Sequence, residues 1–589
     1  MLSAFFTSIV LLAFTYARPR GEVPRPTAMV VKNRTTGQSL TLDHTQLRDL
    51  KGRAPPIGLG PDDLVVVWDG GATMGCFLEL GWEVPANILD LMVETRNCTN
   101  GLFDHKHVTV DEILQKLDLE VPRTGGGSSR RGFAPKAPSK KKREHWNITD
   151  GHRALKVMEK LYPHLVPNTE ITLVQALDRG SYMAAVAVME RSGMRIDARA
   201  YNRFCRCLAD RKRKVDIVRQ LDTLRMYDGL KLNKKRLKAF TKKHRIPWPE
   251  DSKGDLKMTN DVVDDFTRSH PVLEPFRETW RTLKLKPFSL SIVVDGRCRF
   301  DMKPFDTTTA RNNASSLEFP LNLARWNRGF IIAAPGHVLI YLDYSSAEFG
   351  IGAVLSGDPE MLEVYQRADI YIELGKMSGE LKASATKANT PKEIRDRYKP
   401  LGNGLLFGIG EASVAAMLGG RNAKQRAAKL MQAHRERFRV YWKWLDGQLD
   451  LAFLECFQFN PGGWTQQITG DTRTTSAMNF PLQGSCAQIL RKACVLAIEA
   501  GVKVTAPHHD ALVIEAPEEE LECHVVTARW AMVEAAKREL GLALKVDVEE
   551  PVHPTRHLLD SRGLEAWKKV WRNVMKEDPD ENLDGGEKG

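Results

Sequence analysis

An apolar run that ends in an acid constrains the fold of this chain more than any other feature. Val338–Leu342 is a stretch of five apolar residues, and Asp343 follows at once. A run of this length and β-branched content predicts a buried strand, with the acid where the strand ends. A carboxylate at the edge of a core costs several kcal/mol unless a partner compensates it. The sequence therefore requires a partner for Asp343.

A second acid lies in the same kind of position nearer the C-terminal end. Apolar segments on either side of Pro507–His509 predict a β-hairpin with Asp510 at its tip. A single acid at a strand end is more often a turn cap. Two converging carboxylates repel each other unless a cation lies between them, and their oxygen atoms suit Mg²⁺. The pair, Asp343 and Asp510, therefore favours a metal site.

Between the two acids the sequence predicts a helix that starts near residue 390. Thr390 is expected as N-cap, Pro391 as the first helical residue, and Glu393 as the partner in a capping box. This start signal places the following residues on a regular helical face.

Two cations and an aromatic residue share one face of that helix. Arg395 and Lys399 are four residues apart, and Asn403 and Phe407 continue the stripe. Such a face can hold a triphosphate and cover a base. A pair of cations at this spacing is also common on solvated helices, so the assignment depends on its neighbours.

Composition sets the broader limits. The chain has 589 residues, 42% of them hydrophobic, which is enough for roughly three or four domains. A net charge of +12 favours a polyanionic partner. The nine cysteines contain no C-x-x-C pair, so we expect reduced thiols and no structural zinc.

Two segments near the N-terminus need separate interpretation. The first apolar stretch lacks the basic start of a signal peptide and is short for a membrane span, so we expect a buried strand. Residues 122–145 are rich in Gly, Ser, Pro and cations, which predicts a linker or disordered insertion.

The basic stretches 211–214 and 231–245 have helical spacing, and alone they indicate an ordinary solvated face.

Taken together, the motifs resemble those of the DNA polymerase I family, family A, in its bacterial and phage type. DYSSAE at 343–348, R-x-x-x-K…FG at 395–408 and HD at 509–510 occur in the order and spacing of motifs A, B and C. The resemblance covers about 170–560 and, weakly, the N-terminal region. It implies an α+β right-hand polymerase with palm, fingers and thumb, preceded by an RNase H-like exonuclease-type α/β domain.

The resemblance also implies domain boundaries. They are 1–120 for a degenerate 3′–5′ exonuclease-like domain, 121–146 for a basic disordered linker, 147–170 for a remnant helix of the exonuclease-like domain, 171–290 for the thumb, 291–360 for the palm with motif A, 361–440 for the fingers with motif B, 441–565 for the palm with motif C, and 566–589 for a C-terminal tail. The basic stretches of the thumb would then grip duplex phosphates.

The family's catalytic roles carry over to matching positions. Asp343 and Asp510 would hold two Mg²⁺ ions, with the Tyr344 carbonyl completing a metal shell. Glu348 falls where the family's acid blocks the ribose 2′-OH, so the resemblance implies dNTP as substrate. Lys399 is a candidate general acid for the leaving pyrophosphate.

Other positions imply contacts with nucleotide and DNA. Arg395 and Lys399 would bind the triphosphate, with Asn403 and Phe407 beside the nucleotide. The residues that would touch the primer-template are Arg311, Asn479, Gln483 and His509.

Some positions depart from the family pattern. Asn403 replaces an aromatic residue, which affects sugar stacking, and Pro400 should kink the fingers helix at a cost of ~3 kcal/mol. Ala511, Thr475 and Tyr371 stand where an acid, an arginine and a histidine are usual. None of these changes removes a metal ligand, so we expect activity to survive.

The N-terminal domain lacks the family's nuclease acids. Ala13 and Thr15 occupy the first acidic motif, Thr73 the second, and Asn147 and Gly151 the third. Hydrolysis that depends on metal ions cannot run without carboxylates to hold them. The sequence therefore predicts an exonuclease-like fold without proofreading.

Three functional interpretations remain open. A template-directed DNA polymerase requires a primer-template, dNTPs and Mg²⁺, and we expect it to act as a monomer, without a membrane, in the cytoplasm of a bacterium or phage-infected cell. A single-subunit RNA polymerase shares two motifs, but Glu348 argues against it. A non-catalytic DNA-binding relic predicts binding with a steep salt dependence and no incorporation.

Overall fold

The computed structural model describes residues 2–102, 148–252, 254–285, 290–314, 318–420 and 422–577. The chain forms two compact units. The first unit contains residues 1–193, 299–315 and 335–550, and the second contains 194–298, 316–334 and 551–589. The predicted linker at 121–146 and Asn147 lie outside the described residues.

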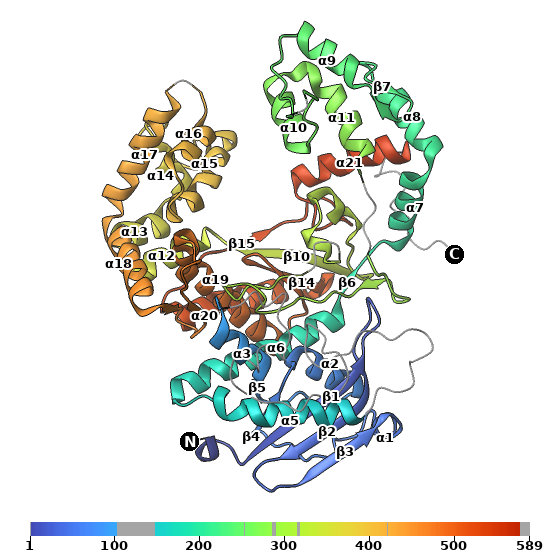
Figure 1. Cartoon of the computed structure of the whole chain (residues 1–589), viewed down its shortest axis with the longest axis vertical. Helices are drawn as coiled ribbons and strands as arrows, with labels where there is room; N and C mark the ends of the chain where they lie inside the picture. Colours follow the sequence, from blue (N-terminus) through green and yellow to red (C-terminus); the bar gives the residue numbers. More distant parts are fainter. Residues whose placement is uncertain are drawn as a thin grey trace. The chain divides into compact units, whose positions relative to one another are not determined.

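The first unit begins with a five-stranded sheet in the order β3-β2-β1-β4-β5 (Figure 1). β1 is antiparallel to β2 and parallel to β4, and β4 is parallel to β5. The predicted N-terminal strand is confirmed, since the apolar stretch forms β1. The strands are β1 (Ser8–Ala17), β2 (Arg25–Asn33), β3 (Ser39–Asp43), β4 (Asp63–Val67) and β5 (Asn87–Asp90).

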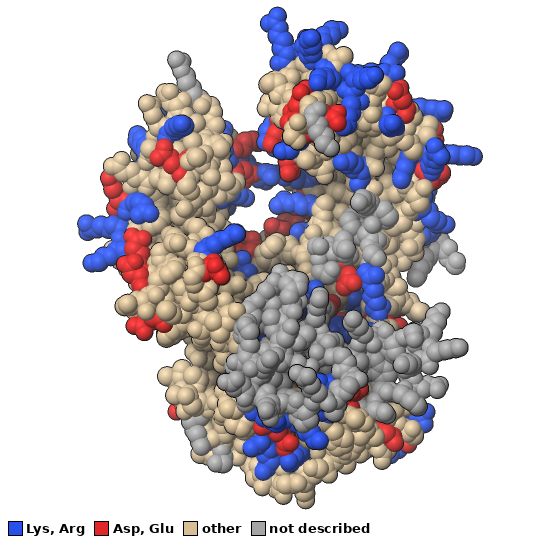
Figure 2. Space-filling model, in the orientation of Figure 1, with Lys and Arg blue, Asp and Glu red and all other residues tan. Residues whose placement is uncertain are grey.

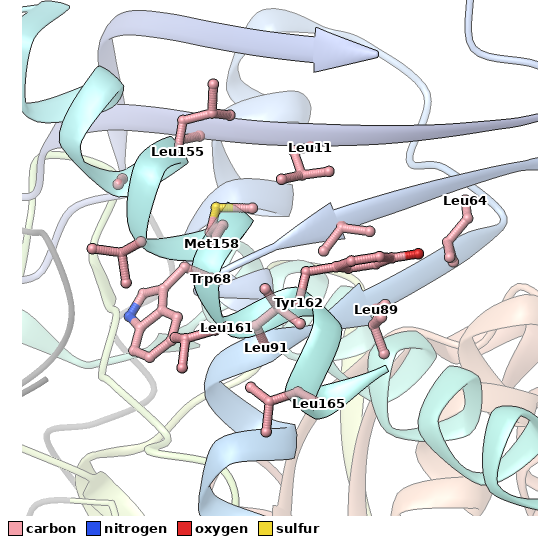
Figure 3. Close-up of a cluster of buried hydrophobic side chains, with 14 of the residues drawn as sticks. Leu11, Leu64, Trp68, Leu89, Leu91, Leu155, Met158, Leu161, Tyr162 and Leu165 are labelled. Atoms are coloured by element: carbon pink, nitrogen blue, oxygen red, sulfur yellow. The ribbon is translucent and has the colours of Figure 1, made fainter. Parts of the chain in front are cut away.

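Side chains alternate across β1 and divide this domain's core into two layers. Leu11 and Ala13 pack with the side chains of α5, whereas Leu12 and Phe14 pack with those of α2. Figure 3 shows the first of these layers, with Leu11 facing the helix that carries Leu155, Met158, Leu161, Tyr162 and Leu165. The helices are η1 (Leu2–Ala4), α1 (His44–Asp49), α2 (Gly70–Leu80), α3 (Leu91–Thr99), α5 (Ile148–Leu165) and α6 (Glu170–Ser192).

A second sheet in the first unit has the order β13-β14-β10-β15. Its central strand β10 is antiparallel to both neighbours, and helices α19 and α20 contact the sheet. The predicted hairpin around Asp510 is confirmed by the pairing of β13 with β14. The elements are β10 (His337–Tyr344), β13 (Val504–His508), β14 (Ala511–Pro517), β15 (Val546–Glu549), α19 (Thr474–Glu499), η5 (Glu518–Glu520) and α20 (Leu521–Leu540).

The position of Asp343 differs slightly from the prediction. The strand continues through Asp343 to Tyr344 and does not end before the acid. The reason is β15, which pairs with this end of β10 and places Asp547 opposite Asp343. Asp343 is therefore held by ladder hydrogen bonds on a rigid strand.

Helices dominate the chain between β10 and β13. They are α12 (Ala347–Ser356), α13 (Pro359–Arg367), α14 (Ile370–Met377), α15 (Lys392–Leu406), α16 (Glu411–Leu418), α17 (Ala423–Arg437) and α18 (Arg439–Glu455). A short hairpin follows, formed by β11 (Phe457–Phe459) and β12 (Thr465–Gln467).

The second unit is mainly helical, and the basic stretches with helical spacing lie mainly in its helices α8 and α9. Its core contains Leu237, Phe276 and Trp280. The predicted C-terminal tail from 566 begins inside α21, whose Trp567 and Trp571 are buried. The elements are α7 (Ala198–Ala209), α8 (Arg211–Leu221), α9 (Lys234–Lys243), α10 (Asn260–Ser269), η2 (Pro271–Leu273), α11 (Glu274–Leu283), η3 (Pro320–Asn322), η4 (Arg325–Phe330), α21 (Ser561–Met575) and the short strands β6 (Met194–Arg195), β7 (Tyr227–Asp228), β8 (Lys231–Leu232) and β9 (Arg297–Cys298).

All nine cysteines lie in the described residues, and none of them is part of a disulfide. Among the helices that the structure describes, none is both long and apolar enough to cross a bilayer.

Candidate active site

Asp343 and Asp510 lie side by side at one end of the strands β10 and β14 in the second sheet. Asp343 pairs across the ladder with Ala511, the residue that directly follows Asp510. The backbone N–H of Tyr344 donates to the carbonyl oxygen of Asp510 over 3.3 Å. The fold therefore joins two acids that are far apart in the sequence, as the hydrophobic patterns around them predict.

Burial and mutual repulsion disfavour ionisation of both carboxyls. The pKa of Asp343 is raised to about 8, first by burial and then by the charge of Asp510, with Glu549 and Asp547 also contributing. The pKa of Asp510 is raised to about 6, by burial and by the charge of Glu348. A bound cation would relieve both effects.

The donor atoms at this edge fit Mg²⁺. The Oδ1 atom of Asp343 is buried and has no hydrogen-bond partner within the described part of the chain. Within that part, no three His, Cys, Asp or Glu side chains are arranged to hold a metal ion. Mg²⁺ commonly takes one or two carboxylates and completes its shell with water and phosphate oxygens, so Asp343 and Asp510 offer a suitable partial site.

The hairpin tip exposes His509 next to the acids. The Tyr341 hydroxyl lies 2.9 Å from Nδ1 of the buried His508. His509, by contrast, is exposed and has a left-handed backbone with φ 59°. The tip therefore presents His509 to solvent while His508 holds the hairpin against β10.

Glu348 is held from both sides in the first turn of α12. The residue as a whole is buried, with 9% of its surface exposed. Arg311 donates from Nη2 to Oε1 over 3.3 Å, and Asn403 donates from Nδ2 to Oε2 over 3.4 Å. Three residues predicted to have separate roles thus form one network, and Asn403 supplies a hydrogen bond that a phenylalanine ring could not.

Helix α15 starts one residue later than predicted. Its N-cap is Pro391, which has an extended backbone with ψ 137°, and no side chain caps the helix. The predicted capping box at Thr390 and Glu393 is therefore wrong, because the extended proline moves the N-cap and takes Glu393 out of the required spacing. Pro400 lies inside the helix as predicted.

The two cations of the predicted phosphate-binding face are each already paired with an acid. Arg395 donates from Nε to Asp369 over 2.7 Å and also lies 4.9 Å from the ring centroid of Tyr371. Lys399 Nζ lies 3.2 Å from Asp396. Sequence reasoning missed Asp369, because an acid before α14 is fully explained as its N-cap. A triphosphate would have to compete with these acids.

A cavity of about 500 Å³ opens beside Arg395. Its wall includes Ser345 and Ser346 directly after Asp343 and Tyr344, and it contains several cations and fewer acids. A polyphosphate fits the charge of this wall. The charged residues are Arg367, Lys376, Lys387, Arg395, Lys545, Asp369, Glu373 and Asp547.

The end of α15 lies against the start of α19. Phe407 is the C-cap of α15, and Gly408 follows with φ 69°. A side chain at Gly408 would meet the Met478 methyl group at 3.0 Å, so the chain passes close to α19 here. Asn479 and Gln483 are both partly exposed on the same helix α19.

In the first sheet, the residues expected at nuclease positions form packing contacts. Ala13 belongs to the core, and Thr15 Oγ1 lies 3.0 Å from Thr27 Oγ1. Gly151 of α5 packs against Val30 and Thr15, because a Cβ there would meet Val30 at 2.8 Å. Thr73 is buried on α2.

Two acids near these positions are used as helix caps. Asp69 accepts a hydrogen bond from the backbone of Ala72, and Asp90 accepts from Gly70, Met92 and Val93. Backbone donors therefore occupy both carboxylates.

The basic stretches of the second unit lie on exposed helices. Lys212, Lys235, Lys242 and Lys243 are exposed on α8 and α9. Figure 2 shows Lys and Arg side chains gathered over this part of the molecule, at the upper right of the view. Such a surface suits a polyanion.

Comparison with known proteins gives sequence relatives over part of the chain. DNA polymerase I of Caldicellulosiruptor bescii is 26% identical over 236 residues, covering 37% of this chain and 26% of the relative. The thermostable DNA polymerase I of Thermus thermophilus is 22% identical over 444 residues, covering 69% of this chain and 51% of the relative. The DNA polymerase of Mycobacterium phage D29 is 24% identical and covers 45% of this chain and 42% of the relative. The chain thus spans about a quarter to a half of these relatives.

A solved structure shares the fold over nearly the whole chain. It is the POL domain of Pol1 from M. smegmatis in complex with DNA primer-template and dNTP, with a TM-score of 0.68 and 17% sequence identity. The match covers 95% of this chain and 97% of that domain. Residues 313–551 match the family model of DNA polymerase family A. Asp343, Glu348, Arg395 and Asp510 therefore all lie in the part of the chain that is similar to DNA polymerase family A.

Proposed function

We propose that the chain is a template-directed DNA polymerase that adds dNMP to a primer 3′-OH and does not proofread. The observation that carries this proposal is the adjacency of Asp343 and Asp510, with a buried Asp343 oxygen without a hydrogen-bond partner in the described chain. The M. smegmatis protein of similar fold is in complex with DNA primer-template and dNTP, which supports the same substrates here.

The two acids and the Tyr344 carbonyl would hold two Mg²⁺ ions. When bound, such ions would lower the pKa of the primer 3′-OH and neutralise charge on the leaving pyrophosphate. Asp343 is suited to this task because β10 and its two neighbouring strands fix its position.

The residues on α15 would bind and orient the nucleotide. When the nucleotide binds, the Arg395 guanidinium leaves Asp369 and pairs with the triphosphate. Lys399 donates a proton to the leaving pyrophosphate. Phe407 lies next to the templating base, and Glu348 excludes a ribose 2′-OH. His509, Arg311, Asn479 and Gln483 contact the primer-template.

The domain roles follow from the same resemblance. Residues 291–360 and 441–565 form the palm around the second sheet, 361–440 the fingers and 171–290 the thumb. The exposed cations on α8 and α9 support a thumb that grips duplex phosphates.

The first sheet would be an exonuclease-type domain without nuclease activity. Its strand order β3-β2-β1-β4-β5 supports an RNase H-like fold. Side chains without carboxylates at Ala13, Thr15, Thr73 and Gly151 support the absence of proofreading.

Primer extension with a matched and a mismatched 3′ end tests the proposal. We expect Mg²⁺-dependent extension of the matched end with dNTP, no degradation of the mismatched end, and loss of extension by at least about 10³-fold in Asp343→Ala or Asp510→Ala. Asp446→Ala, an exposed acid on α18, is the matched control and should extend normally.

Each contrary result identifies another interpretation. Extension with rNTP as efficient as with dNTP would favour an RNA polymerase. Binding of DNA with a steep salt dependence but no extension would indicate a DNA-binding relic. Degradation of the mismatched end would contradict the loss of proofreading.

A further inference from the structure

The segment 303–311, which leads into Arg311, has a strained backbone. Lys303, Phe305 and Ala310 have left-handed φ values of 45°, 57° and 59°. This conformation is unfavourable for a residue that carries a side chain. Such strain persists only where surrounding structure holds the chain in place.

Helix α3 of the N-terminal domain holds this segment by side-chain hydrogen bonds. Arg96 donates from Nη1 to the Pro304 carbonyl over 2.9 Å, and its Nη2 lies 3.5 Å from Asp306. Asn100, the C-cap of α3, donates from Nδ2 to the Thr308 carbonyl over 2.7 Å. Both side chains are well buried: that of Arg96 is 13% exposed, and the whole residue Asn100 is 3% exposed.

The β11–β12 hairpin forms the other side of this support. The Trp464 indole donates to the same Thr308 carbonyl over 3.0 Å and stacks on Phe305 at 5.3 Å between centroids. Asn97 of α3 accepts from the Thr465 backbone over 2.7 Å. The strained segment is therefore fixed on one side by α3 and on the other by the hairpin.

The other end of the segment reaches Glu348. Thr307 Oγ1 accepts from the Arg311 backbone over 2.9 Å, and the buried Arg491 donates to the Ala310 carbonyl over 2.7 Å. Arg311 then donates to Glu348 over 3.3 Å. A continuous path of contacts runs from α3 to the carboxylate beside Asp510.

We propose that Arg96 and Asn100 are positioning residues for the polymerase site, which act through segment 303–311 on Arg311 and Glu348. This inference rests on the proposed function. It assigns the N-terminal domain a task in nucleotide selection that is separate from any nuclease chemistry.

The test uses full-length Arg96→Met and Asn100→Ala variants. We expect discrimination between dNTP and rNTP, measured as the ratio of kcat/KM values, to fall about 10-fold, the size expected from one lost buried hydrogen bond. Lys51→Met is the matched control, because it removes an exposed ion pair with Glu79 of the same domain, and its ratio should stay unchanged.

Two further readouts separate positioning from general loss of structure. Arg96→Lys, which keeps a cation opposite Asp306, should restore part of the discrimination. When Arg96→Met is combined with Glu348→Gln, the discrimination ratio should fall no further than in Glu348→Gln alone. An unchanged ratio in Arg96→Met, or fully additive losses in the double variant, would overturn the proposal.

Hydrogen exchange tests, without relying on activity, whether Arg96 holds segment 303–311 in place. Peptides that cover 302–314 should exchange at least about 10-fold faster in Arg96→Met than in the wild type, while peptides from α20 should be unaffected. Unchanged exchange at 302–314 would overturn the inference. A wild-type chain that does not extend primers would instead overturn the proposed function, and the exchange result would still decide whether α3 holds the segment.

Discussion

The guanidinium of Arg395 and the carboxylate of Asp369 are joined by a hydrogen bond of 2.7 Å. The cation that would meet the nucleotide's triphosphate is therefore already paired. Both side chains are less than a fifth exposed, so solvent screens the pair only in part.

Asp369→Asn should increase the affinity for nucleotide. The amide keeps the N-cap of α14, which Asp369 forms with Tyr371 and Ile372, and removes the charge that competes with phosphate. We expect the KM for dNTP to fall about 3- to 10-fold in steady-state primer extension. Glu363→Gln, which breaks an exposed ion pair on α13, is the control, and a rise in KM for Asp369→Asn would contradict the prediction.

Glu348→Ala should admit ribonucleotides. The change removes the carboxylate that Arg311 and Asn403 hold and leaves room beside the incoming sugar. We expect kcat/KM for rNTP to rise at least about 10-fold while dNTP extension continues. Single-nucleotide incorporation with each substrate measures the ratio of kcat/KM for rNTP to that for dNTP. An unchanged ratio would show that Glu348 does not exclude the ribose 2′-OH.

His434 should make the protein less stable in acid. Burial lowers the pKa of His434 to about 3, and its Nδ1 accepts from the Trp442 indole over 3.2 Å, so the folded state contains the neutral ring. Because the folded pKa lies below the unfolded value of 6.5, this contribution is present above pH 6.5 and is lost as the pH falls toward 3. The loss is about 1.4 kcal/mol per pH unit.

Urea unfolding at pH 7.5 and 5.5 measures this effect. His434→Gln can still accept from Trp442 but does not titrate, so its free energy of unfolding should change less between the two pH values. An equal change in both proteins would rule out His434 as the source.

Glu94→Gln should destabilise the first unit strongly. Arg179 forms two hydrogen bonds of 2.7 Å with Glu94, and both residues are almost fully buried. The variant leaves a buried guanidinium without its counter-charge, which costs about 3–5 kcal/mol in the free energy of unfolding. Urea denaturation measures this loss, and the double variant Arg179→Met/Glu94→Leu should be markedly more stable than Glu94→Gln alone.

Local patterns predicted much of the fold. Apolar runs identified β1, β10 and the hairpin at Asp510, because hydrophobic period and turn residues are properties of neighbours in sequence. The start of α15 was wrong by one residue, since Pro391 can adopt either a helical or an extended ψ and only the surrounding structure decides between them.

The supporting contacts of the site could not be predicted in the same way. Nothing near Asp369 in the sequence indicates Arg395 as its partner, and Asn100 lies more than two hundred residues from Thr308. Single polar residues at such separations carry no periodic signal. Asp343, Glu348 and Asp510 were therefore singled out from sequence, whereas Asp369 and the α3 residues that contact segment 303–311 were not.

The strained segment 303–311 has a consequence for how this chain could be shortened. A version that began after residue 100 would lack Arg96, Asn97 and Asn100. It would lose the hydrogen bonds from Arg96 to the Pro304 carbonyl, from Asn100 to the Thr308 carbonyl and from the Thr465 backbone to Asn97. The relaxed segment would then be free to swing Arg311 away from Glu348. If α3 holds segment 303–311 as proposed, the N-terminal domain is indispensable to the site around Glu348 whatever chemistry it performs itself, and its removal is not neutral.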